Sequence, residues 1–545
     1  SLPLTLLAEA APDEFLAAVD RGLAGDQPIL LELFREKGDA LFSSPAHTQL
    51  LFALETLAWS DAYLSRVVIA LAKLARIDPG GRWANRPLAS LRSIFLLWLP
   101  QTRASLEKRL RALDSLRERI PEVAWKVMDA LLPKETDHQG PTARPRWRDW
   151  APEGDVRVTR MEYGRAIHDL IARMFDDVGV DGARWSDLIE ALPELPRDDC
   201  DALVAKLATF ANEEIQARDL ACVWNALRTL ISRYRPRPNS ERGLLSELID
   251  QLVQTMARLE PTEPLGRFGW LFGNHPELPE GRGEDWRAYE LEVASRQREA
   301  VQQLYGRRGL AWLSEFVQKV ELPDRLGAAI ARSDFADEVA DDLLNEYLRL
   351  DQPRLHSFVS GFIHGKVYVA GLDWAKERLR SLGLNWSSTK RAAFCVCLPF
   401  KSATWEIVEG LDSATAREYW TTVRAFYIEE TEVEVASRRL LEHSRPHVAV
   451  DLLQHHVRSP NVPATLVCDV LEAVLHCPRN DADQQRLSGH DVSDLLEVVS
   501  NSPDVDEARV AMLEWAYLPA LGRHQYTPKL LLRELARKPE FFVEV

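Results

Sequence analysis

The chain has 545 residues, of which 46% are hydrophobic and 28% charged, and it carries a formal net charge of −16. This composition is typical of a globular protein and excludes an intrinsically disordered one. The acidic balance argues against nucleic acid as a partner, because a surface that follows a phosphate backbone needs clustered lysines and arginines.

The compartment and the extent of the chain follow from a few simple features. Six cysteines are too few for a disulfide framework, which favours the reducing cytoplasm. No uninterrupted apolar run reaches about 18 residues, so we expect no transmembrane helix and no membrane partner. The start, Ser1–Leu4, has neither an initiator Met nor the basic segment of a signal peptide. Because the chain also stops directly after a helix-like segment, we expect it to be part of a longer cytoplasmic protein.

Apolar residues recur with the period of an α-helix along most of the chain. In 61–77, for example, Leu64, Val67, Leu71 and Leu74 share one face. The same period predicts helices at 104–120, 163–178, 202–211, 220–234, 244–259, 336–350 and 462–476. Many prolines directly precede such runs, as is typical of the first turn of a helix. We therefore predict an all-α protein, an α-solenoid-like array of degenerate helical hairpins of the tetratricopeptide or HEAT type.

Two segments test this prediction in detail. The segment 366–372 ("KVYVAGL") leaves helix and strand open, because its β-branched and aromatic residues suit a strand that would have no partner here. The segment 434–457 ("EVASRRLLEHSRPHVAVDLLQHHV") predicts a hairpin with its turn at 444–446. The small side chains of Ala436 and Ala449 would let its two helices approach closely.

Two stretches without an apolar stripe, 133–156 and 260–284, interrupt the helical pattern. They divide the chain into predicted modules at 1–135, 136–260 and 261–545. Both stretches contain tryptophan, so we expect both to pack on the body of the protein rather than to act as free linkers.

The stretch 78–82 ("DPGGR") allows two interpretations. A phosphate-binding Walker loop needs G-x-x-x-x-G-K-[ST] after a strand, whereas here the Lys-[Ser/Thr] pair is missing and the preceding run is helical. The other interpretation is a corner in which Asp78-Pro79 stops one helix and Gly80 or Gly81 takes the positive φ that ends it. We expect the corner, with Pro87 starting the next helix, and no bound nucleotide.

Metal-binding patterns in the sequence are incomplete. The region 443–477 contains several histidines and two cysteines, but Pro446 interrupts the helix that would align His443 with His447. No C-x-x-C or H-E-x-x-H pattern accompanies them. The pair Cys395 and Cys397 does not share a helical face, and we expect both side chains to be buried as small apolar residues.

Catalytic patterns are incomplete as well. Ser360 and His364 are four residues apart, but the G-x-S-x-G elbow of a nucleophilic serine is absent. We expect no cofactor, no metal and no enzymatic activity in this chain. A helical enzyme with a site that no motif reveals is the alternative.

Three stretches, 82–86, 144–150 and 233–237, combine arginines with aromatic residues. Arginine and tryptophan can stack, and both are frequent in the hot spots of protein interfaces. The alternative is that these arginines pair with helix carbonyls and acids while the aromatic rings pack between helices. The candidate protein-binding residues are Arg82, Trp83, Arg86, Arg146, Trp147, Arg148, Trp150, Arg235 and Arg237.

Five longer phrases complete the sequence evidence: "DPGGRWANRPLASLRSIFLLWLPQT" (78–102), "FGWLFGNHPELPEG" (268–281), "LPFKSATWEIVEGLDSATAREYWTTV" (398–423), "ASRRLLEHSRPHVAVDLL" (436–453) and "LEWAYLPALGRHQYTPKLLLRELARKPEFFVEV" (513–545). Together they resemble the C-terminal helical regions of large bacterial STAND-type ATPases, several of which act in anti-phage defence. The phrases span nearly the whole chain, and they are structural rather than catalytic.

The resemblance implies a division of labour in a longer protein. An N-terminal effector and a central ATPase would precede this chain, which would be the helical-repeat sensor that binds a foreign (phage) protein. Binding would release oligomerisation and effector activity of the full-length protein. The alternative is an intramolecular scaffold that contacts the rest of the parent chain and has no foreign ligand. No catalytic residue is implied, because the matching phrases carry none.

Overall fold

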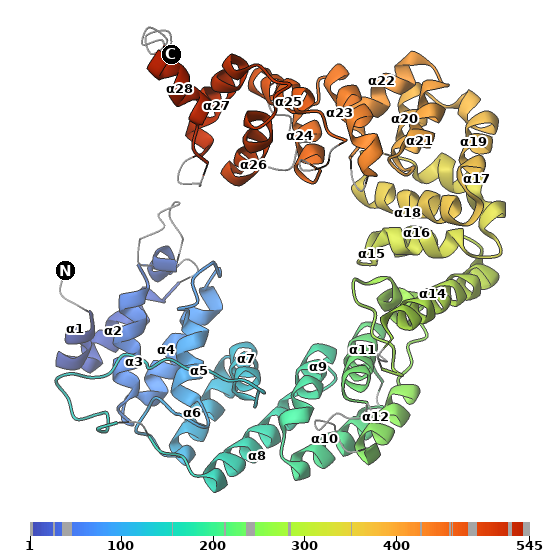
Figure 1. Cartoon of the computed structure of the whole chain (residues 1–545). Coiled ribbons are helices and arrows are strands. Elements are labelled where there is room, and N and C mark those ends of the chain that lie inside the picture. The colour runs from blue at the N-terminus through green and yellow to red at the C-terminus, as the bar shows by residue number, and fades with distance from the viewer. Residues whose placement is uncertain are drawn as a thin grey trace. The chain divides into compact units, whose positions relative to one another are not determined.

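The computed structural model confirms an all-α protein over the residues that it describes. These residues form 28 α-helices and five short 3-10 helices, with no strand among them (Figure 1). The described residues are 4–25, 28–34, 46–154, 156–211, 214–235, 246–281, 285–349, 351–425, 428–456, 459, 461–477, 488–521 and 526–537.

The chain divides into two compact units, one formed by residues 1–267 and 277–289 and the other by residues 268–276 and 290–545. The predicted modules 1–135 and 136–260 both lie in the first unit. The division of the chain into three modules stays a prediction.

Over its described residues, the first unit is built from α-helices and two 3-10 helices, and a long loop connects α7 to α8. Its helices are α1 (Leu4–Ala10), α2 (Pro12–Gly22), η1 (Ile29–Phe34), α3 (Thr48–Ala58), α4 (Leu64–Ile77), α5 (Pro87–Phe95), α6 (Leu106–Arg119), α7 (Pro121–Leu131), α8 (Arg160–Asp177), α9 (Gly182–Ala191), η2 (Leu192–Glu194), α10 (Arg197–Phe210), α11 (Ala217–Tyr234), α12 (Ser246–Arg258) and α13 (Pro264–Phe268), the last of which reaches the division between the units.

The second unit continues in the same manner. Its helices are η3 (Gly269–Phe272), α14 (Trp286–Arg308), α15 (Leu313–Lys319), α16 (Pro323–Ala331), α17 (Ala336–Tyr347), α18 (Pro353–Ala370), α19 (Leu372–Ser381), η4 (Gly383–Asn385), α20 (Ser388–Val396), α21 (Ser402–Glu409), α22 (Ser413–Thr422), η5 (Glu430–Glu432), α23 (Val433–Glu442), α24 (Pro446–Gln454), α25 (Ala464–His476), α26 (Gly489–Ser500), α27 (Glu507–Leu521) and α28 (Lys529–Arg537), with the first turn of α14 belonging to the first unit.

Within each unit, most helices pack on helices one or two positions away in the chain (Figure 1). The closest pairs are α1 with α3, α9 with α11, α16 with α18, α20 with α22, and the neighbours from α23 to α28. Most of these helices bury one apolar face in this way, as α4 does with Val67, Leu71 and Leu74. Near-neighbour packing is the local property that a helical-repeat array requires.

The structure shows the conformation of the segment 366–372 and of the predicted hairpin. Residues 366–370 complete α18, and Gly371, with a φ of 73°, turns the chain into α19, so the strand interpretation of 366–372 is excluded. The predicted hairpin consists of α23 and α24, with Ser444 in the left-handed region at a φ of 59°. Ala436 and Ala449 are fully buried between them, as expected.

The corner at 78–87 is confirmed, with one correction to how α4 ends. Gly80 and Gly81 have positive φ values of 77° and 147°, and α5 starts at Pro87. The helix, however, ends at Ile77, because Asp78 is already extended, the conformation that a following proline favours. The glycines therefore turn the loop after the helix and do not cap it.

Backbone-to-backbone contact between α16 and α18 organises the second unit. A Cβ added at Gly361 would lie well under 3.0 Å from the carbonyl oxygen of Asp324, and one at Gly327 equally close to that of Phe358. At Gly365 the added atom would lie 2.6 Å from Ala331 Cβ. The two helices can cross at this distance only because these positions have no side chain.

We expect Gly361→Ala to lower the free energy of unfolding by about 2–3 kcal/mol, because the added methyl group forces the two backbones apart. The measurement is urea unfolding followed by circular dichroism. Gly306→Ala on α14 is the matched control, since a Cβ there meets nothing within 4 Å. That change should stabilise the helix by about 0.5–1 kcal/mol, and an equal effect of both substitutions would contradict the close crossing.

Candidate protein-binding surface

The long loop between α7 and α8 is attached to the first unit along its length, as its tryptophans predicted. Near its start, the Asp137 carboxylate accepts a hydrogen bond from Trp98 Nε1 at 3.0 Å and pairs with Arg92. Further on, Trp59 Nε1 donates to the carbonyl oxygen of Ala143 at 3.1 Å, and the Arg144 guanidinium lies 4.7 Å from the centre of the Trp59 ring. This stretch is therefore part of the folded body.

Two buried glutamates, which we call the glutamate pair, hold the middle of this loop. Glu9 on α1 is 2% exposed, and its carboxylate accepts the backbone N–H groups of Arg146 and Trp147 at 3.0 and 2.7 Å. Glu55 on α3 is 5% exposed and accepts the N–H of Ala143 at 3.0 Å. Carboxylate hydrogen bonds of this kind are stronger than neutral ones and fix the path of the backbone.

Burial also changes the proton affinity of one member of the glutamate pair. Removal from water raises the pKa of Glu55, although hydrogen bonds from Ser90 Oγ and from the N–H of Ala143 lower it in part. The sequence analysis overlooked both glutamates. The sequence does contain an indication of them, namely a lone carboxylate within a helix whose other inward positions are apolar.

Trp147 lies in this fixed loop, and 73% of its surface is exposed to solvent. Its neighbours Arg146 and Arg148 are exposed as well. Arg148 Nε donates to the carbonyl oxygen of Glu9 at 3.0 Å, and its guanidinium lies 5.7 Å from the centre of the Trp150 ring. Because an exposed tryptophan on a rigid backbone loses little conformational freedom on binding, it is a favourable anchor for another protein.

The remaining predicted residues have mixed environments. Trp150 is half-buried, with its ring 5.7 Å from that of Tyr63, so it packs inward. Arg86 forms an ion pair with Asp78 at 2.9 Å in which both side chains are 11% exposed, which stabilises the corner.

The other candidate residues lie elsewhere on the first unit. Arg82 is exposed and lies 5.2 Å from the ring of the half-buried Trp83. Arg235 is exposed and donates to the carbonyl oxygen of Pro279 at 3.0 Å. Arg237 lies outside the described residues.

The predicted residues do not form one surface. Trp150 contacts Tyr63, directly before α4, whereas residues 82–86 follow the other end of the same helix. A helix of 14 residues is about 21 Å long at 1.5 Å per residue, so the two stretches lie at opposite ends of α4. Of the three stretches, 144–150 is the one that combines a fixed backbone with a largely exposed tryptophan.

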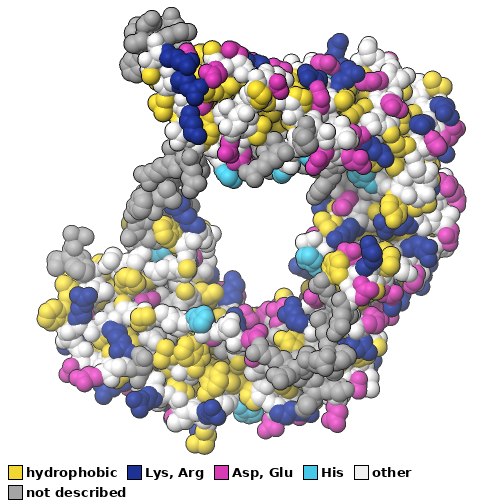
Figure 2. All heavy atoms as spheres, in the orientation of Figure 1, with side chains coloured by type: hydrophobic (Ala, Val, Ile, Leu, Met, Phe, Trp, Pro, Cys, Tyr) yellow, Lys and Arg dark blue, Asp and Glu magenta, His cyan; other side chains and the backbone are white. Residues whose placement is uncertain are grey.

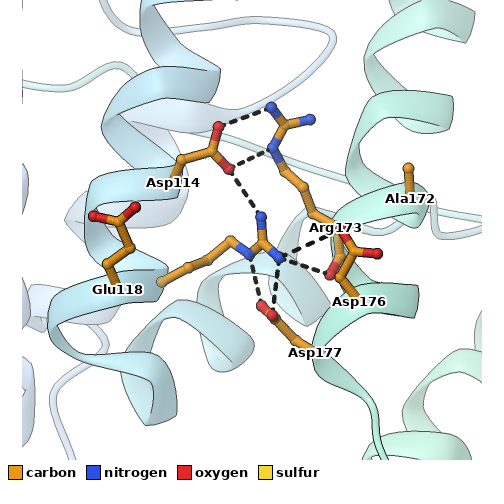
Figure 3. A pocket seen from close by; sticks show the side chains of 7 residues that line it. Asp114, Glu118, Ala172, Arg173, Asp176 and Asp177 are labelled. Atoms are coloured by element: carbon orange, nitrogen blue, oxygen red, sulfur yellow. Dashed lines mark hydrogen bonds and ion pairs between the residues drawn. The ribbon is translucent and has the colours of Figure 1, made fainter.

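A shallow cavity of about 690 Å³ lies between α6 and α8 in the same unit. Figure 3 shows Asp114 and Asp177 facing each other across it, with Arg173 reaching Asp114. Arg117 bridges the two carboxylates, with Nη1 at 2.9 Å from Asp114 and Nε at 2.6 Å from Asp177. The cavity is lined by Asp114, Arg117, Glu118, Ala172, Arg173, Asp176 and Asp177.

The charged side chains that line this cavity form a network of ion pairs. Hydrogen bonds with Asp177 raise the pKa of Arg117 further above its ordinary value. Burial alone would raise the pKa of Asp114, but the hydrogen bonds from Arg173 and Arg117 outweigh it and lower that pKa. The network of ion pairs joins α6 to α8.

The two residues considered for nucleophilic chemistry lie on α18 in the second unit, where Ser360 is half-buried and His364 is exposed. Cys395 and Cys397 are both buried, as predicted, and burial raises the pKa of each thiol to about 12. Ser360 Oγ shares a hydrogen bond with Cys397 Sγ at 3.1 Å. Partial desolvation of the imidazole lowers the pKa of His364. A thiol with so high a pKa is not a nucleophile at neutral pH.

Over the described part of the chain, no group of three or more His, Cys, Asp or Glu side chains is arranged to hold a metal ion. Likewise, none of the described helices combines the length and the apolar character needed to cross a bilayer. Comparison with protein-family models, with curated proteins and with solved structures found no match to this chain.

The role of the glutamate pair can be tested with Glu9→Gln. An amide oxygen can replace one acceptor, but the NH2 group faces a backbone N–H, so we expect a loss of about 2 kcal/mol in the local stability of the loop. Limited trypsin digestion with mass spectrometry should then show faster cleavage after Arg146 and Arg148. Glu14→Gln on the exposed face of α2 should leave cleavage unchanged. Equal cleavage of wild type and Glu9→Gln would contradict the role of Glu9.

We expect the contact between His168 and Asp199 to stabilise the fold in a pH-dependent way. His168 on α8 lies with Nδ1 2.8 Å from the Oδ1 of Asp199 on α10, and this hydrogen bond raises the pKa of His168 above 6.5. The stabilisation is therefore complete below pH 6.5 and is lost as the pH rises through the pKa of the folded state. His168→Gln should reduce stability in urea more at pH 6 than at pH 8.

The control for this prediction is His490→Gln, because the His490 ring nitrogen lies 3.9 Å from Asp494, beyond hydrogen-bond distance. A loss of stability after His168→Gln that is the same at both pH values would show that the Asp199 contact does not depend on the charge of the ring.

Proposed function

We propose that this chain is a non-catalytic recognition module that binds another protein through the loop at 144–150. The observation that supports this most directly is Trp147, which is 73% exposed although its own backbone is fixed by a buried carboxylate. A tryptophan that serves only the fold is buried, as Trp59 and Trp185 are. An exposed ring on a preformed backbone is instead typical of an interface anchor.

The architecture that we propose around this anchor is an α-solenoid of degenerate helical hairpins. Near-neighbour packing within each unit supports it, as does the hairpin of α23 and α24. Each hairpin in such an array contacts only its neighbours, so its exposed loops and faces are available to a partner with little rearrangement.

The resemblance to the C-terminal regions of STAND-type ATPases supports a more specific role. In this proposal the chain is the cytoplasmic sensor of a larger bacterial anti-phage protein, and its partner is a foreign (phage) protein. Binding activates the parent only if the partner prefers the active arrangement over the inactive one, because equal affinity for both shifts nothing.

The test is binding of individually purified phage proteins to the 545-residue chain, measured by biolayer interferometry. We expect at least one of them to bind, and Trp147→Ala to weaken that binding by about thirtyfold, the loss of about 2 kcal/mol that marks a hot spot. Tyr368→Ala is the matched control, because Tyr368 is an aromatic residue in the second unit that is 86% exposed. A partner that binds both variants equally would refute the role of Trp147.

One combination of results would contradict the sensor role specifically. If no phage protein binds, and deletion of this chain leaves the parent protein constitutively active, the intramolecular scaffold replaces the sensor as the better account.

A further inference from the structure

The arginines beside Trp147 indicate what kind of protein segment the loop binds. Arg146 and Arg148 are both exposed, and no carboxylate of the described residues lies within ion-pair distance of either guanidinium. In this respect they differ from arginines of the same unit such as Arg117 and Arg173, which are paired with acids. An arginine without a carboxylate partner in so acidic a chain is available to one from outside.

We propose that the loop at 144–150 binds an acidic segment of the partner protein, with carboxylates on Arg146 and Arg148 and an apolar side chain on the face of Trp147. This inference rests on the proposed function and adds the chemistry of the partner. Arginine offers several N–H donors in a plane, which suits paired hydrogen bonds to a carboxylate. The tryptophan ring supplies the apolar contact between them.

The geometry of the loop favours this use of Arg148. Its Nε donates to the carbonyl oxygen of Glu9, and its guanidinium lies over the Trp150 ring, so the side chain is already held in one place. A partner carboxylate can therefore meet the outward N–H groups without paying the full entropy of ordering a long side chain. The backbone N–H of Arg146 donates to the Glu9 carboxylate, so the backbone from which the Arg146 side chain extends is fixed as well.

Because the whole chain is acidic, binding of an acidic peptide would indicate a local basic site. A net charge of −16 disfavours acidic partners in general and favours basic ones. On the face shown in Figure 2, basic and acidic side chains are interspersed over most of the surface, apart from a run of basic side chains on α28. Binding of an acidic segment would therefore have to depend on a local site, and the loop offers one.

A single tryptophan between two arginines also favours a protein segment over nucleic acid. A surface that follows a phosphate backbone makes about 6–10 phosphate contacts, and its affinity depends on their number. The loop offers two arginines beside one ring, which matches a short peptide of alternating acidic and apolar residues. Nucleic acid is accordingly one of the outcomes that the experiment distinguishes.

The experiment measures binding of two fluorescein-labelled peptides to the full chain by anisotropy, one with glutamate alternating with leucine and one with lysine in place of glutamate. We expect wild type to prefer the glutamate peptide and Trp147→Ala to weaken its binding by at least about tenfold. The double variant Arg146→Glu/Arg148→Glu should lose the glutamate peptide and prefer the lysine peptide.

The matched control is Arg165→Glu/Arg380→Glu, which changes the net charge by the same amount. Both of these arginines are more than 70% exposed and pair only with an acid on their own helix. This control should retain the preference for the glutamate peptide. Circular dichroism of every variant checks that the fold is intact, which surface substitutions should leave unchanged.

Three results would overturn the proposal. Wild type could prefer the lysine peptide, the control could lose the glutamate peptide as completely as the loop variant, or oligothymidylate could displace the glutamate peptide at a lower concentration than unlabelled peptide does. If the glutamate peptide fails to bind while a phage protein still binds through Trp147, the acidic partner is wrong and the recognition function stands. If Trp147→Ala weakens binding of neither the glutamate peptide nor a phage protein, the acidic partner and the recognition function are both wrong.

Discussion

A buried carboxylate must receive hydrogen bonds from its surroundings, because an ionised group without partners in a protein interior is strongly unfavourable. In the first unit, the carboxylates of Glu9 and Glu55 receive them from the same loop. The loop in turn needs these acceptors, since an irregular segment cannot satisfy its backbone N–H groups within itself. The two requirements satisfy each other, and the position of Trp147 is their consequence.

A different constraint operates in the second unit, where the absence of side chains decides the packing. Gly327 and Gly361 let α16 and α18 cross with their backbones in contact. Such a crossing depends on the absence of a side chain, whereas the glutamate pair depends on a charged acceptor at each position. The first unit is therefore held in register at the loop by specific hydrogen bonds, and the second at this crossing by steric fit.

The helical pattern was predictable from the sequence because it is local. Apolar period, proline at the first turn and glycine after a helix located α4, α5, α23 and α24 to within a few residues, and they identified 78–87 as a corner. The end of α4 at Ile77 agrees with the predicted run 61–77, but the capping role given to the glycines was wrong, because the residue before Pro79 is already extended. The fold class was therefore within reach of periodicity and turn chemistry.

The site was only partly predictable, because its geometry depends on contacts between distant residues. Arginine beside tryptophan identified 144–150, but the same pattern also identified Arg86, which the structure places in an ion pair with Asp78. Nothing in a sequence shows that the residue 137 positions before Arg146 will fix its backbone. In the same way, the GFIHG sequence at 361–365 is a small-residue pattern whose meaning depends on Gly327 in another helix.

The fixed loop also bears on how binding could reach the rest of the protein. It leads directly into α8, whose first turn is closed by reciprocal hydrogen bonds between Thr159 and Glu162, and α8 is joined to α6 by Arg117. A partner that only covered Trp147 would leave these contacts unchanged and would exert no influence beyond its own affinity. A sensor needs a partner that binds more tightly to one arrangement of this region than to another. The loop is suited to that task because its fixed backbone would transmit such a preference, whereas a flexible loop would absorb it.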